Sequence, residues 1–222
     1  MDSAWFSWST GKDSAFALYE VQKDRLFDVR ALLTTVTAGF DRVSMHSTRK
    51  DLLQAQSRAL GIPLEIIEIP QGCTNEIYED KFRQANTKAK AEGIEHILFG
   101  DLFLEDIRRY REKALKPTGL TPQFPLWQRD TKALAQTMIE SGLEAYITCI
   151  DLRKLDRSMV GRRFDQNFLN DLPKDVDPCG ENGEFHSFVA YAPNFKFPIS
   201  ISRGITREDK DFLFCDFTLA TD

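Results

Sequence analysis

A short polar stretch near the start of the chain has the residue types of a phosphate-binding loop. Residues 6–16 read FSWSTGKDSAF, so a short apolar run stops at Ser9, passes through Gly11 and Lys12, and continues in a helical pattern. After a strand, the N–H groups of such a loop and the positive end of the following helix point at the same place. The lysine adds a positive charge there. This stretch therefore predicts a cradle for phosphate groups.

The spacing of this loop excludes the two most common nucleotide-binding loops. A Walker loop has a glycine five residues before the glycine of its glycine–lysine pair, and a hydroxyl residue after the lysine. Here Phe6 stands at the first position and Asp13 follows Lys12, so both requirements fail. The G-x-G-x-x-G spacing of a dinucleotide site is also missing from the sequence. A capped turn with an exposed Lys–Asp pair remains the alternative to a phosphate site.

Residues 9–14, STGKDS, resemble the SGGKDS pyrophosphate-binding loop of the N-type ATP pyrophosphatases, also called the adenine nucleotide alpha hydrolase superfamily. Enzymes of this superfamily cleave ATP between the α- and β-phosphates. The resemblance therefore implies that ATP is used and that the loop holds the leaving pyrophosphate. Thr10 stands where glycine is usual. Because threonine has a β-carbon, we expect the loop to keep its shape if residue 10 has no positive φ.

Each side chain of this loop has a physical role in such a site. The N–H groups from Gly11 onward and the hydroxyls of Ser9 and Ser14 are expected to bind the β- and γ-phosphates, while Lys12 offsets their charge. Asp13 would repel bare phosphate, so we expect it to bind the Mg²⁺ that accompanies ATP. Lys12 and Asp13 are therefore candidate catalytic residues. The expected nucleotide-binding set is Ser9, Thr10, Gly11, Lys12, Asp13 and Ser14.

Four stretches of the second half resemble the diphthine–ammonia ligase family. They are residues 99–115, 124–151, 161–165 and 176–195, within a resemblance that runs from about residue 3 to about residue 200. Members of this family adenylate a carboxylate and displace AMP with ammonia to give an amide. Their E-G-G-E-Y/F-E-T motif corresponds to residues 181–187, which read ENGEFHS here. These departures indicate a different, bacterial-type branch and leave the acid substrate open.

The resemblance and the predicted strand ends supply the remaining candidate site residues. Glu181, Glu184 and His186 lie in a turn-rich approach to a strand, where His186 is a candidate general base or orients the ammonia. A polar hairpin is the alternative for this stretch. Asp101 follows an apolar strand, at the end where open α/β sheets bind ligands, and is expected to face substrate or Mg²⁺. The superfamily binds adenine and ribose after its second strand, which implicates Thr35, His46 and Arg49.

The elements that must position these residues follow from the apolar pattern. Short apolar runs alternate with amphipathic stretches, which is the βαβ pattern of a parallel sheet with helices on its faces. The runs predict strands at 3–8, 29–36, 64–69, 96–100 and 145–150. The amphipathic stretches predict helices at 11–23, 47–60, 75–92, 105–115 and 131–141. On the fourth helix, Arg108, Arg109 and Arg111 are expected to form a solvated face. The pattern therefore predicts an α/β fold, and the resemblance implies that this fold is of the adenine nucleotide alpha hydrolase type.

The pattern changes after about residue 152. Apolar residues then alternate, as at Phe195, Phe197, Ile199 and Ile201, which is the period of antiparallel strands. We therefore predict an ATP pyrophosphatase-type core over residues 1–152 and a small, β-rich, substrate-binding extension over residues 153–222.

Composition limits the partners and the location of the protein. The formal net charge of -5 disfavours a nucleic-acid partner, and no apolar run is long enough to cross a membrane. The four cysteines are dispersed, which is typical of reduced thiols in a cytoplasmic protein. The expected partners are ammonia and a small-molecule or protein carboxylate, and a homodimer is left open. Two alternatives remain: a nucleotide-binding sensor without catalysis, and an adenylating enzyme with another nucleophile.

Overall fold

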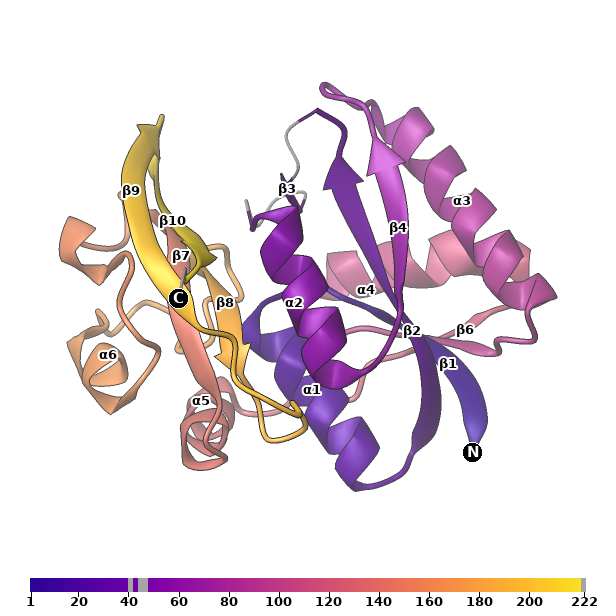
Figure 1. The fold of residues 1–222 in the computed structure, drawn as a ribbon, viewed down its shortest axis with the longest axis horizontal. Helices are drawn as coiled ribbons and strands as arrows, with labels where there is room; N and C mark the ends of the chain where they lie inside the picture. Colours follow the sequence, from indigo (N-terminus) through magenta and orange to yellow (C-terminus); the bar gives the residue numbers. More distant parts are fainter. Residues whose placement is uncertain (40–41, 44–47, 221–222) are drawn as a thin grey trace.

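The computed structural model describes residues 1–39, 42, 43 and 48–220, and its first half forms a parallel sheet (Figure 1). The parallel strands are β1 (Asp2–Ser7), β2 (Phe27–Thr37), β4 (Leu64–Ile69), β5 (His96–Leu98) and β6 (Thr121–Gln123). They lie in the order β4-β2-β1-β5-β6, and the short β3 (Arg42–Val43) pairs antiparallel with the end of β2. This is the α/β sheet expected from the βαβ pattern.

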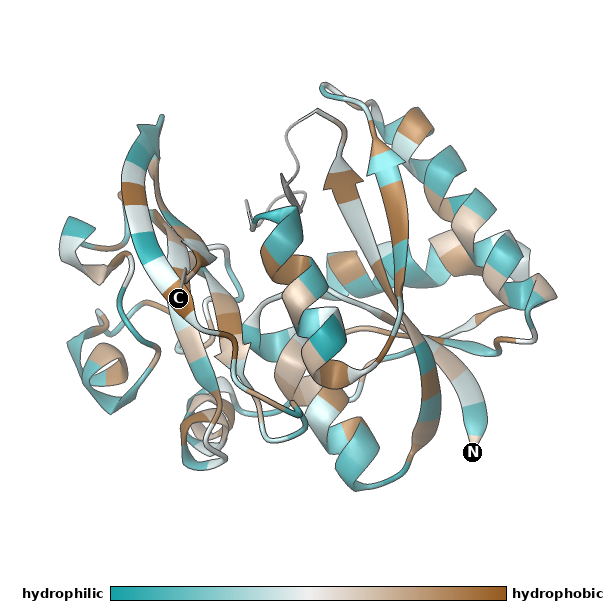
Figure 2. Ribbon diagram, viewed as in Figure 1, coloured by the Kyte–Doolittle hydropathy of each residue, from teal (hydrophilic) through white to brown (hydrophobic). Residues whose placement is uncertain are grey.

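Helices cover both faces of this sheet because side chains alternate along its strands. Phe6 and Leu32 point to the face that packs on α1 (Lys12–Lys23) and α2 (Lys50–Leu60). Trp5 and Leu33 point to the other face, under α3 (Asn75–Ala91) and α4 (Glu105–Leu115). Figure 2 shows hydrophobic residues in β2 and β4 and mainly hydrophilic residues along α3.

The second half of the chain forms a separate antiparallel sheet. Its strands are β7 (Glu144–Asp151), β8 (Phe185–Tyr191), β9 (Ile201–Asp209) and β10 (Phe212–Leu219), in the order β8-β7-β10-β9. Two helices, α5 (Thr131–Glu140) and α6 (Gln166–Asp171), and two short 3₁₀ turns, Lys116–Thr118 and Arg157–Met159, complete the structure as far as it is described.

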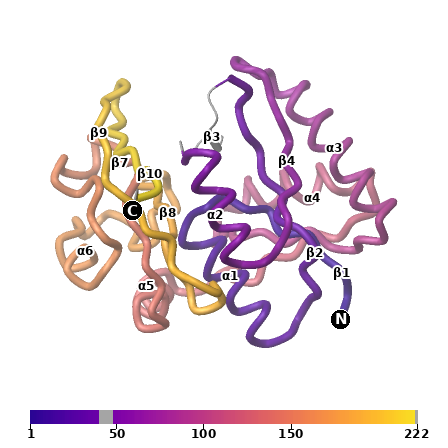
Figure 3. The backbone as a smooth tube through the Cα atoms, in the orientation of Figure 1, coloured from indigo at the N-terminus to yellow at the C-terminus, as the bar shows by residue number. Residues whose placement is uncertain are grey.

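The two halves share one hydrophobic core. Residues of α1 and α2, such as Phe16 and Leu53, belong to the same buried cluster as Phe188 and Val189 of β8. Figure 3 shows α1 and α2 between the parallel sheet and the second sheet, where the chain colours change from purple to orange and yellow. Across the described residues, no helix is both long and apolar enough to span a membrane.

The structure confirms the five strands and five helices predicted from the βαβ pattern, as far as their residues are described, with one change of partner. The strand expected from the alternation at Phe195, Phe197 and Ile199 is wrong: residues 192–200 form turns and irregular structure, and β9 begins at Ile201. The strand expected at 145–150 exists as β7, but it pairs with β8 and β10 instead of joining the parallel sheet. The length and residue types of this apolar run identified it as a strand. Which strands it pairs with depends on segments that are far away in the sequence. β7 therefore belongs to the second sheet, and the division of the chain at residue 152 stays a prediction.

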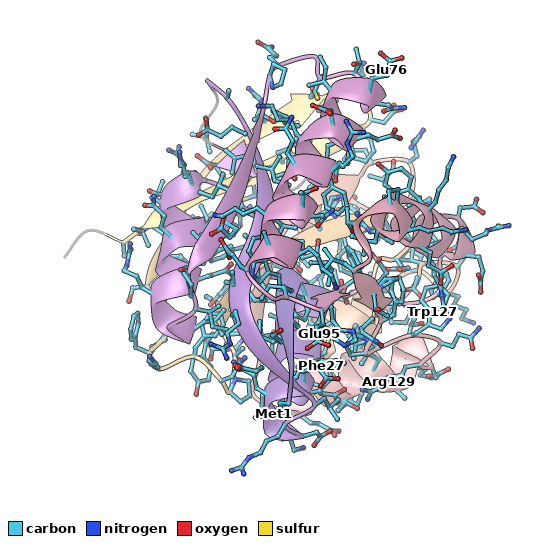
Figure 4. The ribbon with its side chains drawn as sticks, turned by 90° about the vertical axis from the view of Figure 1, so that its right-hand side faces the viewer. Met1, Phe27, Glu76, Glu95, Trp127 and Arg129 are labelled. Atoms are coloured by element: carbon cyan, nitrogen blue, oxygen red, sulfur yellow. The ribbon has the colours of Figure 1, made fainter. Side chains whose placement is uncertain are left out.

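The direction of the strands decides where ligands meet the parallel sheet. In Figure 4, Met1, Phe27 and Glu95 lie together at the amino-terminal edge of the sheet, and Glu76, at the start of α3, lies at the opposite edge. The loop after β1 and the residues after β5 share this second, carboxyl edge because β1 and β5 are parallel neighbours. Open α/β sheets bind their ligands at such an edge.

Candidate active site

The loop after β1 is held in a conformation that threonine seldom adopts. Thr10 has a φ of 72°, so the condition under which a threonine was expected to leave the shape of the loop intact is not met. The side chain is buried, and its Oγ1 lies 2.9 Å from Oγ1 of Thr48. Its carbonyl oxygen accepts hydrogen bonds from Nε2 of Gln56 at 3.1 Å and from the N–H of Val189 at 3.0 Å. These contacts offset the backbone strain of a β-branched residue in this region.

Hydroxyl groups and N–H groups converge where the loop becomes α1. The hydroxyls of Ser9 and Ser14 lie 2.9 Å apart, and the N–H of Gly11 donates to Oγ of Ser9 at 3.3 Å. The N–H of Lys12 donates to Oγ of Ser187 on β8 at 3.2 Å. No side chain caps α1, whose first residue is Lys12. The positive end of the helix is therefore directed at the space in front of the loop.

Lys12 is a buried cation with close anionic partners. Its side chain is 2 % exposed, and Nζ donates to both carboxylate oxygens of Asp13, at 3.1 and 2.9 Å, and to the carbonyl oxygen of Cys179. Nζ also lies 5.1 Å from the ring centre of Phe185. Burial by itself lowers the pKa of Lys12, but the charge of Asp13 and the surrounding groups raises it above its ordinary value. The ammonium group is therefore charged at neutral pH.

A cavity of about 200 Å³ brings distant candidate residues together. All loop residues except Thr10 line it, along with Asp101 after β5 and the turn that leads into β8. Glu181 comes from that turn, and His186 comes from β8 itself. Gly100 allows this approach, because a Cβ there would lie 2.9 Å from the backbone N and Cα of Ser14. The predicted phosphate loop and the predicted acidic motif therefore face one space.

The pKa values of Glu181 and His186 are shifted in opposite directions in this cavity. Burial raises the pKa of Glu181 to about 7, although its Oε1 accepts a hydrogen bond from the N–H of Leu102 at 2.9 Å. Burial and the charge of Lys12 lower the pKa of His186 to about 4. The imidazole is therefore neutral at pH 7 and a weak base. Of the two roles that the sequence suggested for His186, this favours orienting a nucleophile over accepting its proton.

Glu184 is placed behind the cavity. Its side chain is 2 % exposed, and its Oε1 accepts hydrogen bonds from the N–H of Asp177 at 3.3 Å and from Nδ2 of Asn182 at 3.2 Å. Asp177 in turn accepts from the N–H groups of Cys179 at 2.8 Å and Glu181 at 3.3 Å. Glu184 does not line the cavity. Both carboxylates hold the shape of the turn that presents Glu181.

Cys179 lines the cavity as a thiol. Burial raises its pKa above the ordinary value for cysteine. Its Sγ donates to the carbonyl oxygen of Thr131 at 3.4 Å. The protonated sulfur is not a nucleophile at neutral pH, because the reactive form of cysteine is the thiolate.

Two of the residues predicted to bind adenine and ribose, Thr35 and Arg49, are not among those that line this cavity. Arg49 makes a bidentate ion pair with Asp216 on β10, with an Nη2–Oδ2 distance of 2.5 Å. It thereby links the start of α2 to the second sheet. Thr35 lies within β2, where it pairs with Ile67 of β4. His46 is outside the described residues. The roles of these three residues in nucleotide binding stay predictions.

Arg111 lines the cavity and was expected on a solvated helix face. Its side chain is 23 % exposed, and its Nε lies 3.4 Å from Oδ2 of Asp101. The guanidinium lies 4.8 Å from the ring centre of Phe99. By contrast, Arg109 is 70 % exposed. The helical period could have indicated that Arg111 faces inward, because Arg111 stands one turn before Leu115, the buried residue of α4.

Comparisons with known proteins relate both halves of the chain to diphthamide synthase. The protein-family models for the diphthamide synthase N-terminal and C-terminal domains match residues 2–122 and 130–219, respectively. Diphthine–ammonia ligase of Homo sapiens is 29% identical over 171 residues, which is 74% of this chain and 64% of the human protein. The Bos taurus enzyme is 33% identical over 135 residues, 58% of this chain and 50% of that protein. The chain therefore spans less than two thirds of the length of these relatives.

Proposed function

The chain belongs to the diphthamide synthase family, and we propose that it is an ATP-dependent ligase. In the proposed reaction a carboxylate attacks the α-phosphate of ATP, pyrophosphate leaves, and ammonia then displaces AMP to give an amide. One observation supports this most: Lys12 and the positive end of α1 face Asp101 and Glu181 across a single cavity. Such a cavity offers a binding site for an anion next to carboxylates that can take part in proton transfer.

The loop supplies the pyrophosphate site of this proposal. The helix N-terminus and the charged Lys12 offer a place for the two outer phosphates, and the hydroxyls of Ser9 and Ser14 offer hydrogen bonds. The leaving group then departs with its negative charge already offset. Positioning and charge stabilisation of this kind account for most of the catalysis in phosphate chemistry.

The residues of the cavity also fit Mg²⁺. Asp13, Asp101 and Glu181 offer carboxylate oxygens, the ligand type that this ion prefers. No preassembled group of three or more His, Cys, Asp or Glu able to bind a metal occurs in the part of the chain that the structure describes. Mg²⁺ usually takes only one or two protein carboxylates and completes its shell with substrate phosphates and water. We propose Asp13 as its protein ligand, where the ion would neutralise phosphate charge.

The acidic turn supplies the proton acceptor for the second half of the reaction. Ammonium must lose a proton before its nitrogen can attack the acyl carbon. Glu181 has a pKa of about 7 and lines the cavity, so its carboxylate can accept that proton near neutral pH. The neutral imidazole of His186 can accept a hydrogen bond from the resulting ammonia. As the C–N bond forms, the nitrogen loses a second proton to solvent, and AMP leaves with the electron pair of the acyl–oxygen bond.

The test measures pyrophosphate and AMP formed from Mg·ATP and ammonia with a panel of carboxylates, diphthine-bearing protein among them. We expect one acid to stimulate both products, and Lys12→Met to abolish this stimulation. Lys23→Met is the matched control, because Lys23 stands at the other end of α1 and should leave the activity unchanged. AMP formation that persists in Lys12→Met would refute the assignment of the loop. Nucleotide binding without product formation for any acid would favour a sensor.

A further inference from the structure

We infer that Arg111 holds the α-phosphoryl group of ATP, apart from the pyrophosphate at Lys12. The inference rests on the proposed function and adds a second anion-binding residue to the same cavity. The first argument is charge. Lys12 and Arg111 are the lysine and arginine side chains that line the cavity among the described residues.

Lys12 is too constrained to contact all three phosphates. Its Nζ is held by both oxygens of Asp13 and by the carbonyl oxygen of Cys179, with the side chain 2 % exposed. It therefore stays at the end of the cavity formed by the loop and the turn before β8. Phosphate groups farther from this end need another cation.

Arg111 has the orientation and the unused donors for that task. Its guanidinium lies over the ring of Phe99 at 4.8 Å, and Asp101, at 3.4 Å, is its ion-pair partner among the described residues. A guanidinium presents its N–H groups in one plane as a fork, and this fork can bind two phosphate oxygens at once. The Asp101 contact is longer than an ordinary hydrogen bond, so it leaves most of the five donors available.

The neighbouring arginines of α4, Arg108 and Arg109, lie outside the cavity and have other partners. Arg108 lies over the rings of Phe124 and Trp127 and pairs with Glu112 at 2.8 Å. Arg109 points to solvent and pairs with Asp106. Neither lines the cavity. Of these three arginines, Arg111 is therefore the one able to contact a nucleotide at the loop, and Arg109 offers a matched control.

The test measures binding of pyrophosphate and of AMP, each with Mg²⁺, by calorimetry. We expect Arg111→Met to weaken AMP binding at least about tenfold, the effect of losing a charged bidentate contact, and to change pyrophosphate binding less than about twofold. Arg109→Met should change neither. Should Arg111→Met fail to fold, Arg111→Lys keeps the charge but loses the fork, and the same selective loss is expected.

The outcomes separate this inference from the proposed function. Unchanged AMP binding in the Arg111 variant, or an equal loss for AMP and pyrophosphate, would overturn the role of Arg111 alone. A wild-type protein that binds neither ligand would overturn the proposed function as well. Thermal unfolding of each variant, measured beside binding, identifies any loss that comes from misfolding.

Discussion

At the level of single residues, the burial of Glu181 makes the stability of the protein depend on pH. Its pKa rises from 4.5 to about 7 on folding. Between these values the folded protein binds more protons than the unfolded chain, so the free energy of unfolding falls as pH rises. The folded state is destabilised by up to about 3 kcal/mol once the carboxylate ionises.

Glu181→Gln should remove this dependence. Urea unfolding of the ligand-free protein, measured from pH 5 to pH 8, should show a smaller decline of stability in this variant than in the wild type. Glu95→Gln is the control, because Glu95 is exposed at the opposite edge of the sheet (Figure 4). Equal declines in the wild type and Glu181→Gln would mean that the carboxylate is hydrated in the folded protein.

Thr10 leads to a second prediction at this scale. Its hydroxyl is paired with that of Thr48 in a buried site, so Thr48→Val leaves a buried hydroxyl without a partner. This should cost about 1–3 kcal/mol of unfolding free energy in the wild type. In a Thr10→Gly background the cost should disappear, because the partner hydroxyl is already gone.

A double-mutant cycle measured by urea unfolding gives this coupling directly. The control is Thr148→Val, which removes a buried hydroxyl that has no hydrogen-bond partner among the described residues. Its effect should be the same with Thr10 and with glycine. A coupling near zero between Thr10 and Thr48 would show that other contacts hold the positive φ.

The residue scale also shows what sequence could predict about the site. Ser9, Lys12, Asp13, Asp101 and Glu181 were expected and do share one cavity. Each follows a strand or lies in a motif, so local signals identified them. Glu184 does not line the cavity, and this depends on the direction that a buried side chain takes inside a folded loop. The positive φ of Thr10 depends on contacts to α2 and β8. Sequence spacing contains neither fact.

At the level of elements, the approach of β5 to α1 closes the cavity. A Cβ at Gly100 would lie 2.9 Å from the backbone of Ser14, and backbone cannot move aside as a flexible side chain can. Gly100→Ala should therefore destabilise the protein by about 1–3 kcal/mol and weaken pyrophosphate binding, since α1 must shift. Calorimetry and urea unfolding measure the two effects.

The control for Gly100 is another glycine of the same βα unit. Gly93 has a φ of 79° with open space around it, so Gly93→Ala should cost about 1 kcal/mol through backbone strain. It lies before β5, away from the carboxyl edge, and pyrophosphate binding should not change. Equal binding in both variants would show that the β5–α1 contact does not shape the site.

Elements were easier to predict than their partners. The βα alternation located β1, β2, β4 and β5, because each is a short apolar run beside an amphipathic helix. β6 reads TPQ, which has no apolar run to indicate a strand. β7 has such a run, but its pairing with β8 and β10 depends on residues that follow it by more than 30 positions. Local patterns do not include that information.

At the level of the whole molecule, the predicted phosphate loop is held by contacts from both halves of the chain. The N–H of Val189 on β8 donates to the carbonyl oxygen of Thr10 at 3.0 Å, and the N–H of Lys12 donates to Oγ of Ser187 at 3.2 Å. Nε2 of Gln56 donates hydrogen bonds to the carbonyl oxygens of both Thr10 and Val189, and so links the loop to β8. The loop therefore depends on the second sheet for its shape.

This dependence predicts that a ligand at the loop stabilises both halves together. At a concentration of Mg²⁺-pyrophosphate one hundred times its Kd, the stabilisation is about 2.7 kcal/mol, which corresponds to about hundredfold slower hydrogen exchange of amides that open with the site. Peptides from α1 and from β8 should slow by similar factors. The outer strand β9, exposed along most of its length, should slow much less. Slower exchange in α1 without any change in β8 would mean that the parallel sheet binds the ligand by itself. In that case β8 could open while the ligand stays bound, so the ligand would not slow its exchange.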